Sequence, residues 1–299
     1  MITFPISSVE TWWWLPVLTA FTISTLTSTG GVSGAFVLLP FQVSVLGFTS
    51  PAVSPTNLLY NIIAIPSGVY RFHREKRMVW PLAWVTIIGT LPGIFIGAII
   101  RIKFLPDPGA FKLFAGLVLL YLGFKLGWDI IYRKKQTALR PAERGRFEVA
   151  TLEFNLRRIG YEFNGQAYYA PTLPIMALSF IVGIIGGTYG IGGGAIIAPF
   201  FVAVFGLPVH TVAGAALLGT LVTSIAGVLF YTVLAPFYTS SGLTISPDWL
   251  LGTMFGVGGA AGIYIGARIQ KFIKEKIIKT ILVTILLFIA LKYIIGYFK

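Results

Sequence analysis

The sequence predicts an all-α polytopic membrane protein: two inverted repeats with broken helices and membrane hairpins, joined by a linker that forms a small cytosolic β-hairpin element. The first observation behind this fold class is composition, because 56% of the residues are hydrophobic, 11% are charged and the mean hydropathy is +0.84. The second is a glycine-rich stretch that occurs once in each half of the chain. The third is an uneven distribution of lysine and arginine among the loops.

The membrane spans follow from the lengths of the apolar segments. A helix needs about 20 apolar residues to cross the hydrocarbon of a bilayer. Segments 80–100, 111–131, 249–267 and 277–298 meet that length. Residues 1–10 carry no lysine or arginine, so no cleavable signal peptide is expected. Because the chain has no cysteine, disulfides and thiolate metal sites are excluded.

An internal repeat divides the chain. The stretch GGTYGIGGGAIIAPFF, residues 186–201, has a counterpart in TGGVSGAFVLLPFQ, residues 29–42. A constant offset aligns several glycines of the two halves: Gly31 with Gly190, Gly34 with Gly193, and Gly47 with Gly206. The predicted organisation is therefore a tandem duplication. Its parts are a first transmembrane repeat, a cytosolic linker and a second transmembrane repeat, at residues 1–132, 133–171 and 172–299.

The distribution of charge gives the relative orientation of the repeats. The net charge is +13, but the basic residues lie in loops beside predicted spans, so nucleic acid is not an expected partner. Residues 71–77 contain four lysines and arginines, whereas their repeat counterpart, residues 235–248, contains none. Because basic loops stay in the cytoplasm, these counterparts are expected on opposite sides of the membrane. The repeats are then inverted, although a parallel arrangement of four spans plus four remains open.

Each half is expected to contain a helix, a glycine break, two short helices and two full spans. In the first half the first helix covers residues 12–28, and the short helices cover residues 36–46 and 55–70. The short pieces are expected to form a hairpin within the membrane. Irregular backbone at that depth is tolerated where it is buried in protein or lines a wet cavity. A cavity is therefore expected beside each glycine stretch.

The glycine breaks are the first candidate binding site. Where a helix restarts, its first N–H groups are unpaired and carry partial positive charge, which attracts an anion. The substrate-binding candidates at the two breaks are Thr29, Gly30, Gly31, Ser33, Gly34, Thr188, Tyr189, Gly190, Gly192, Gly193 and Gly194. The alternative is that these glycines only let helices pack closely, a role expected for Gly93, Gly97, Gly262 and Gly266.

Polar residues on apolar segments are the second candidate. Asn57 and Asn61 lie one turn apart, and Thr220 and Thr223 lie on the corresponding segment of the second half. A polar strip is therefore expected to face a glycine stretch in each half. Hydrogen bonding between helices, without a substrate, is an equally open interpretation.

Ionisable residues indicate little intramembrane chemistry. Asp129 is the acidic residue expected within a span, where it can pair with Lys125 as a structural ion pair or a coupling pair. His210 is a weaker candidate for proton coupling. No Ser-His, His-Glu or paired-carboxylate constellation is expected inside the membrane, so no enzyme, catalytic residue, metal site or cofactor is predicted.

The linker has a different pattern from the spans. Its segments FEVATLEFNL and GYEFNGQAYYA alternate, and Asn164-Gly165 is typical of a two-residue hairpin turn. A small cytosolic β element is expected. It would act as a lid or docking surface, or as a spacer that allows the second half to invert.

These residues also carry a family resemblance over nearly the whole chain. GxGGGxxxxP at residues 190–199, then Gly206-Leu207-Pro208 and Asp248-Trp249, resemble the sulfite exporter TauE/SafE family. The resemblance implies a multi-pass transporter of the cytoplasmic membrane that moves sulfite, sulfoacetate or other sulfonates. The N-terminus is expected outside. Coupling to a proton or another ion, the direction of transport and the oligomeric state stay open. An anion channel and an intramembrane enzyme are the alternatives.

Overall fold

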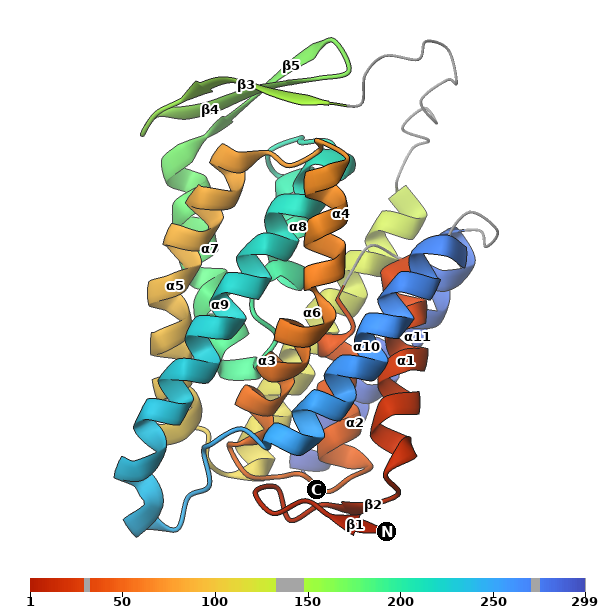
Figure 1. Ribbon diagram of the computed structural model, residues 1–299, viewed down its shortest axis with the longest axis vertical. Coiled ribbons are helices and arrows are strands. Elements are labelled where there is room, and N and C mark those ends of the chain that lie inside the picture. The colour runs from red at the N-terminus through yellow and green to blue at the C-terminus, as the bar shows by residue number, and fades with distance from the viewer. Residues whose placement is uncertain (30–32, 133–147, 270–274, 299) are drawn as a thin grey trace.

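The computed structural model describes residues 1–29, 33–132, 148–269 and 275–298 as a bundle of helices aligned along one axis (Figure 1). A three-stranded sheet caps one end, called the sheet end, and both termini lie at the other, called the terminal end. The first-half helices are α1 (Trp14–Thr29), α2 (Ala35–Ser44), α3 (Val53–Ala64), α4 (Pro66–Arg74), α5 (Trp80–Lys103) and α6 (Pro108–Tyr132). The second-half helices are α7 (Thr172–Tyr189), α8 (Gly194–Ala203), α9 (Val209–Tyr238), α10 (Trp249–Ile269) and α11 (Glu275–Tyr297).

Six of the described helices are long and apolar enough to cross a membrane. They are α5, α6, α7, α9, α10 and α11. Helix α2 is apolar but has only 10 residues, about 15 Å of helix, which is half the hydrocarbon thickness. The predicted all-α polytopic membrane fold is confirmed.

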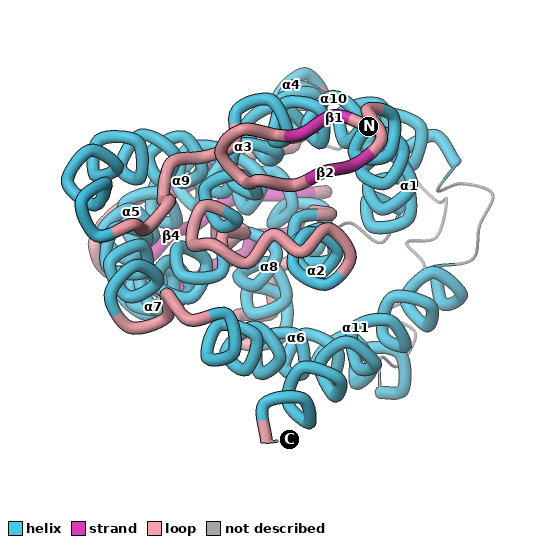
Figure 2. Tube along the Cα trace, turned by 90° about the horizontal axis from the view of Figure 1, so that it is seen from below, coloured by secondary structure: helices cyan, strands magenta, loops and turns pink. Residues whose placement is uncertain are grey.

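Counterpart helices run in opposite directions, as an inverted repeat requires. Helix α1 starts at the terminal end, whereas its counterpart α7 starts at the sheet end, directly after the last strand of the sheet (Figure 1). The packing is exchanged in the same way, because α1 packs on α10 and α7 packs on α5. Seen along the bundle axis, these two pairs lie apart, and α6 runs beside α11 (Figure 2).

Glycines bring these helix pairs into backbone contact. A Cβ on Gly93 or Gly97 of α5 would overlap a carbonyl oxygen of α7, at Phe180 or Ile184. In the other pair, a Cβ on Gly262 of α10 would overlap the Phe21 carbonyl oxygen of α1. The predicted close-packing role of these glycines is confirmed, and it joins helices from opposite halves.

Helix lengths differ from the expectation in two places. Residues 55–70 do not form one short helix: α3 ends at Ala64 and α4 begins at Pro66. Pro66 has no N–H to continue the hydrogen-bond ladder, which explains the interruption. The counterpart α9 is continuous over 30 residues, so the prediction of two short helices is wrong for the second half. A sequence rich in leucine, alanine and threonine continues there without an early proline.

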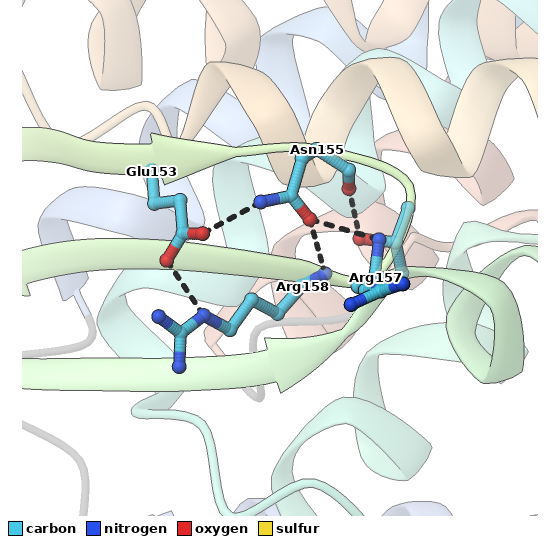
Figure 3. Close-up of polar contacts among 5 residues, drawn as sticks. Glu153, Asn155, Arg157 and Arg158 are labelled. Atoms are coloured by element: carbon cyan, nitrogen blue, oxygen red, sulfur yellow. Dashed lines mark hydrogen bonds and ion pairs between the residues drawn. The ribbon is translucent and has the colours of Figure 1, made fainter.

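The linker forms an antiparallel sheet of β3 (Val149–Phe154), β4 (Arg158–Phe163) and β5 (Gln166–Pro171). Strands β4 and β5 are joined at Asn164 and Gly165, whose φ angles of 53° and 75° are those of a type I′ turn, so the predicted hairpin is confirmed. The turn between β3 and β4 is held by the Asn155 side chain, which accepts from the amides of Arg157 and Arg158 (Figure 3).

The sheet is docked on the helices. The Tyr161 hydroxyl lies 2.8 Å from the Thr211 hydroxyl in the first turn of α9. The Val149 amide donates to the Lys76 carbonyl between α4 and α5. Burial raises the pKa of Tyr161 to about 12, so its phenol stays protonated at neutral pH. These contacts fix the sheet on the helices, and the predicted choice between a lid, a docking surface and a spacer stays open. The first part of the linker, residues 133–147, lies outside the described residues.

The terminal end carries a small hairpin that was not predicted. Strands β1 (Ile2–Thr3) and β2 (Glu10–Thr11) pair there, and Ser7 between them donates to Asp248 through its amide and its hydroxyl. The other Asp248 carboxylate oxygen accepts from the Leu251 amide, which caps the start of α10. The carboxylate is therefore buried with its partners satisfied, and it holds the N-terminal segment on α10.

Candidate functional site

The second-repeat glycine break has a backbone that favours glycine at three positions. Helix α7 ends at Tyr189, and Gly190, Gly192 and Gly193 follow with φ angles of +86°, +71° and +77°. Side chains rarely adopt this region of φ. The turn is also tightly packed, because a Cβ on Gly190 would lie 2.6 Å from the Ser54 carbonyl oxygen. Both the positive φ angles and the lack of room for a side chain explain why glycines recur here.

The amides of this break are the available donors. The Gly194 amide donates to the Gly192 carbonyl at 2.9 Å, and amides in the first turn of α8 donate to the Gly193 carbonyl. Within the described part of the chain, the amides of Gly192 and Gly193 donate to no residue. They stand at the start of α8, where the helix dipole adds partial positive charge. Amides at a helix start are the kind of donor that oxyanions bind.

The first-repeat break is built differently. Gly34, the counterpart of Gly193, has a φ of −70°, so it needs no glycine-specific conformation. Ser33 stands where the second half has Gly192, and its hydroxyl lies 3.4 Å from the Ala35 amide and donates to the Asn61 carbonyl oxygen at 3.0 Å. A side chain thus takes part of the role that bare backbone has in the second half. Of the other candidates, Gly30, Gly31 and the Thr29 side chain lie outside the described residues.

Asn57 on α3 joins the two breaks. Its side-chain nitrogen donates to the Ala35 carbonyl at 3.0 Å and to the Gly190 carbonyl at 2.9 Å. Its side-chain oxygen accepts from Gln42 of α2 at 3.0 Å. Ala35 begins α2 and Gly190 directly follows the last residue of α7, so both broken segments lie within hydrogen-bond reach of one buried side chain.

Asn61, one turn further along α3, repeats this bridge. Its nitrogen donates to the Ile191 carbonyl at 3.2 Å and lies 3.4 Å from the Ser224 hydroxyl of α9. Its oxygen accepts from Ser33. The two asparagines therefore form a polar face that touches both breaks, which is the strip that the sequence predicts.

The polar residues of α9 face the second break. Thr223 lies 3.0 Å from the Gly192 carbonyl, and Thr220 would overlap any Cβ added to Gly194. The Thr220 hydroxyl bonds within its own helix, to the Ala216 carbonyl. These contacts bring Thr220 and Thr223 to the break, but their hydroxyls are turned to backbone carbonyls.

The two candidate hydroxyls at the end of α7 are also engaged. Thr188 donates toward the Gly97 carbonyl of α5 at 3.1 Å, and Tyr189 donates to the Phe36 carbonyl of α2 at 3.1 Å. The side chains of Asn57, Asn61, Thr188 and Thr220 are 1% exposed or less. The described site is thus closed, and its open donors are backbone amides rather than hydroxyls.

One buried charge was missed by the sequence prediction. Arg101 directly follows the predicted span 80–100, yet it lies in the last turn of α5 and is 0% exposed. The available signal was its position four residues after Gly97, because residues four apart lie on the same face of a helix and Gly97 faces another helix. The side chains of Asp129 and His210 lie outside the described residues, so their predicted roles are untested.

The chain is similar to known transporters over most of its length. The family model described as "Sulfite exporter TauE/SafE" matches residues 16–293. A protein of Bacillus subtilis (strain 168) described as "Probable membrane transporter protein YunE" is 23% identical over 274 residues, which cover 88% of this chain and 90% of the relative. No solved structure is significantly similar to the chain.

Proposed function

The chain belongs to the sulfite exporter TauE/SafE family of membrane transporters, and from this premise we propose that it moves small sulfur-containing oxyanions across the cytoplasmic membrane. Sulfite, sulfoacetate and other organosulfonates are the proposed substrates. A secondary transporter needs a site near the middle of the bilayer that each side reaches in turn. The two helix breaks joined by Asn57 are the proposed site.

The observation that carries the proposal is the junction of the two breaks. One asparagine bonds the start of α2 and the end of α7, and the amides of Gly192 and Gly193 remain as donors beside it. A sulfonate has three oxygens that accept from such amides without a full counter-charge. The helix packing around the junction excludes bulk water, which strengthens each hydrogen bond to the anion.

The proposed orientation puts the sheet end in the cytoplasm. The last turn of α4 and the loop after it carry Arg71, Arg74, Lys76 and Arg77 at that end. In contrast, η1 (Thr239–Ser241) and its flanking loop at the other end carry no basic residue. Positive loops stay inside. The N-terminus is then outside.

Cysteine labelling is expected to reproduce this orientation. The chain has no cysteine, so single additions report one position each. A cysteine at Ser241 should react with an impermeant maleimide added outside intact cells. A cysteine at Thr151 of β3 should react only after permeabilisation. Labelling of both cysteines from the outside would contradict the inverted arrangement.

Transport in proteoliposomes tests the function itself. Vesicles that contain the purified protein should take up labelled sulfite or sulfoacetate. Unlabelled substrate inside the vesicles should accelerate this uptake by exchange. Exchange of this kind requires alternating access, so its absence in the presence of flux would favour an anion channel. Conversion of the substrate to another compound would favour an enzyme. Vesicles without protein are the control.

A further inference from the structure

Arg101 is a buried cation placed beside apolar groups. It is 0% exposed and is among the largest fully buried side chains of the described residues. The guanidinium carbon lies 3.8 Å from the centre of the Phe111 ring on α6. A cation stacked on an aromatic ring gains some electrostatic attraction, but the ring does not neutralise its charge.

The hydrogen bonds of Arg101 are incomplete. One terminal nitrogen donates to the Leu105 carbonyl, and the other lies 3.5 Å from the Ser50 carbonyl, at the limit of a hydrogen bond. Within the described part of the chain, the Nε group has no partner, and the hydroxyl of the same Ser50 is also buried without one. Guanidinium has five N–H donors, so this place offers more donors than the described protein groups accept.

Among the described residues the charge also lacks a counter-ion, because none of their carboxylates forms an ion pair with Arg101. An unpaired charge inside a membrane protein is costly and marks a functional position by default. A small oxyanion would supply both the negative charge and the missing acceptors, and its paired oxygens match the planar fork of arginine.

Arg101 lies next to the second glycine break. Gly97, one turn earlier on α5, accepts from Thr188 at 3.1 Å. The Phe111 ring beneath the guanidinium also packs against the ring of Tyr189, with their centres 6.4 Å apart. Because α5 runs from the sheet end to the terminal end, Arg101 lies on the terminal side of the break (Figure 1).

We propose that Arg101, with the Ser50 hydroxyl, forms a second anion site between the terminal end and the glycine break, where a sulfite or sulfonate group binds before or after it occupies the break. The inference rests on the proposed function and deepens it. Under the proposed orientation this is the outer station of the transport path. It supplies the fixed positive charge that the break itself lacks.

The test compares Arg101→Met with Lys103→Met. Both remove one positive charge from the last turn of α5, but Lys103 is exposed. Sulfite should raise the melting temperature of the wild type in detergent. Arg101→Met should melt at or above the wild type without sulfite, because an unpaired buried charge has been removed. It should need at least tenfold more sulfite for half-maximal stabilisation and half-maximal flux, whereas Lys103→Met should match the wild type.

Arg101→Lys keeps the positive charge but lacks the planar guanidinium group. It replaces the methionine variant in the test if that variant does not fold. It should need several-fold more sulfite than the wild type. If folded Arg101→Met responded to sulfite as the wild type does, the second site would be overturned and the proposed function would stand. If the methionine variant failed to fold, the same response in Arg101→Lys would have the same meaning. A wild type that responds to neither sulfite nor sulfoacetate would overturn both.

Discussion

Replacing Gly193 by alanine is expected to lower transport at least tenfold while the protein stays folded. The added Cβ itself fits, since its nearest neighbour would be a Val182 methyl group at 3.4 Å. The φ of +77° and ψ of −35° do not suit alanine, and the strain of about 1–2 kcal/mol favours a rotated peptide. That rotation turns the amides of the break away from the proposed anion. Initial rates of sulfite uptake in proteoliposomes measure the effect.

Gly206→Ala is the matched control for this variant. Gly206 also has a positive φ, +66°, and nothing lies within 4 Å of an added Cβ. The added methyl group is strained by a positive φ here too, but the loop between α8 and α9 holds no proposed site. Both variants should therefore lose some stability, and transport should fall only in Gly193→Ala. Equal transport by both variants would refute an anion site at the Gly193 amide.

Replacing Asn57 by leucine is expected to destabilise the fold by about 3 kcal/mol or more and to abolish transport. The change removes the donor to two carbonyls, at Ala35 and Gly190, and the acceptor for Gln42. All three partners would be left buried, and an unsatisfied buried group costs about 1–3 kcal/mol. A thermal melt in detergent measures the loss.

Gln42→Met is the comparison that isolates the bridge. Gln42 donates to Asn57 but does not connect the breaks, and its own side-chain oxygen Oε1 has no partner among the described residues. Its replacement removes a single hydrogen bond, for which about 1 kcal/mol is expected. If the two variants melted at the same temperature, Asn57 would not be the residue that holds the two breaks together.

The sequence predicted the break residues better than their contacts. The run of glycines at residues 190–194 indicated a turn with bare amides, and three of these glycines have positive φ. The hydroxyls of Thr188 and Tyr189 were expected to serve an anion, yet they bond to carbonyls of α5 and α2. A hydroxyl can rotate toward whichever acceptor the fold brings near, and the local sequence does not contain that acceptor.

Span length and turn type were determined by the sequence itself, because each depends on local chemistry. Apolar length sets a span, and Asn164-Gly165 selects its turn by the backbone angles that these residues tolerate. The burial of Arg101 and the bridge made by Asn57 were decided by the tertiary structure alone. Asn57 and Gly190 are 133 residues apart, so their hydrogen bond exists only after the inverted halves pack together. Arg101 stands one residue beyond the predicted span 80–100, and its burial results from packing against Phe111 of α6.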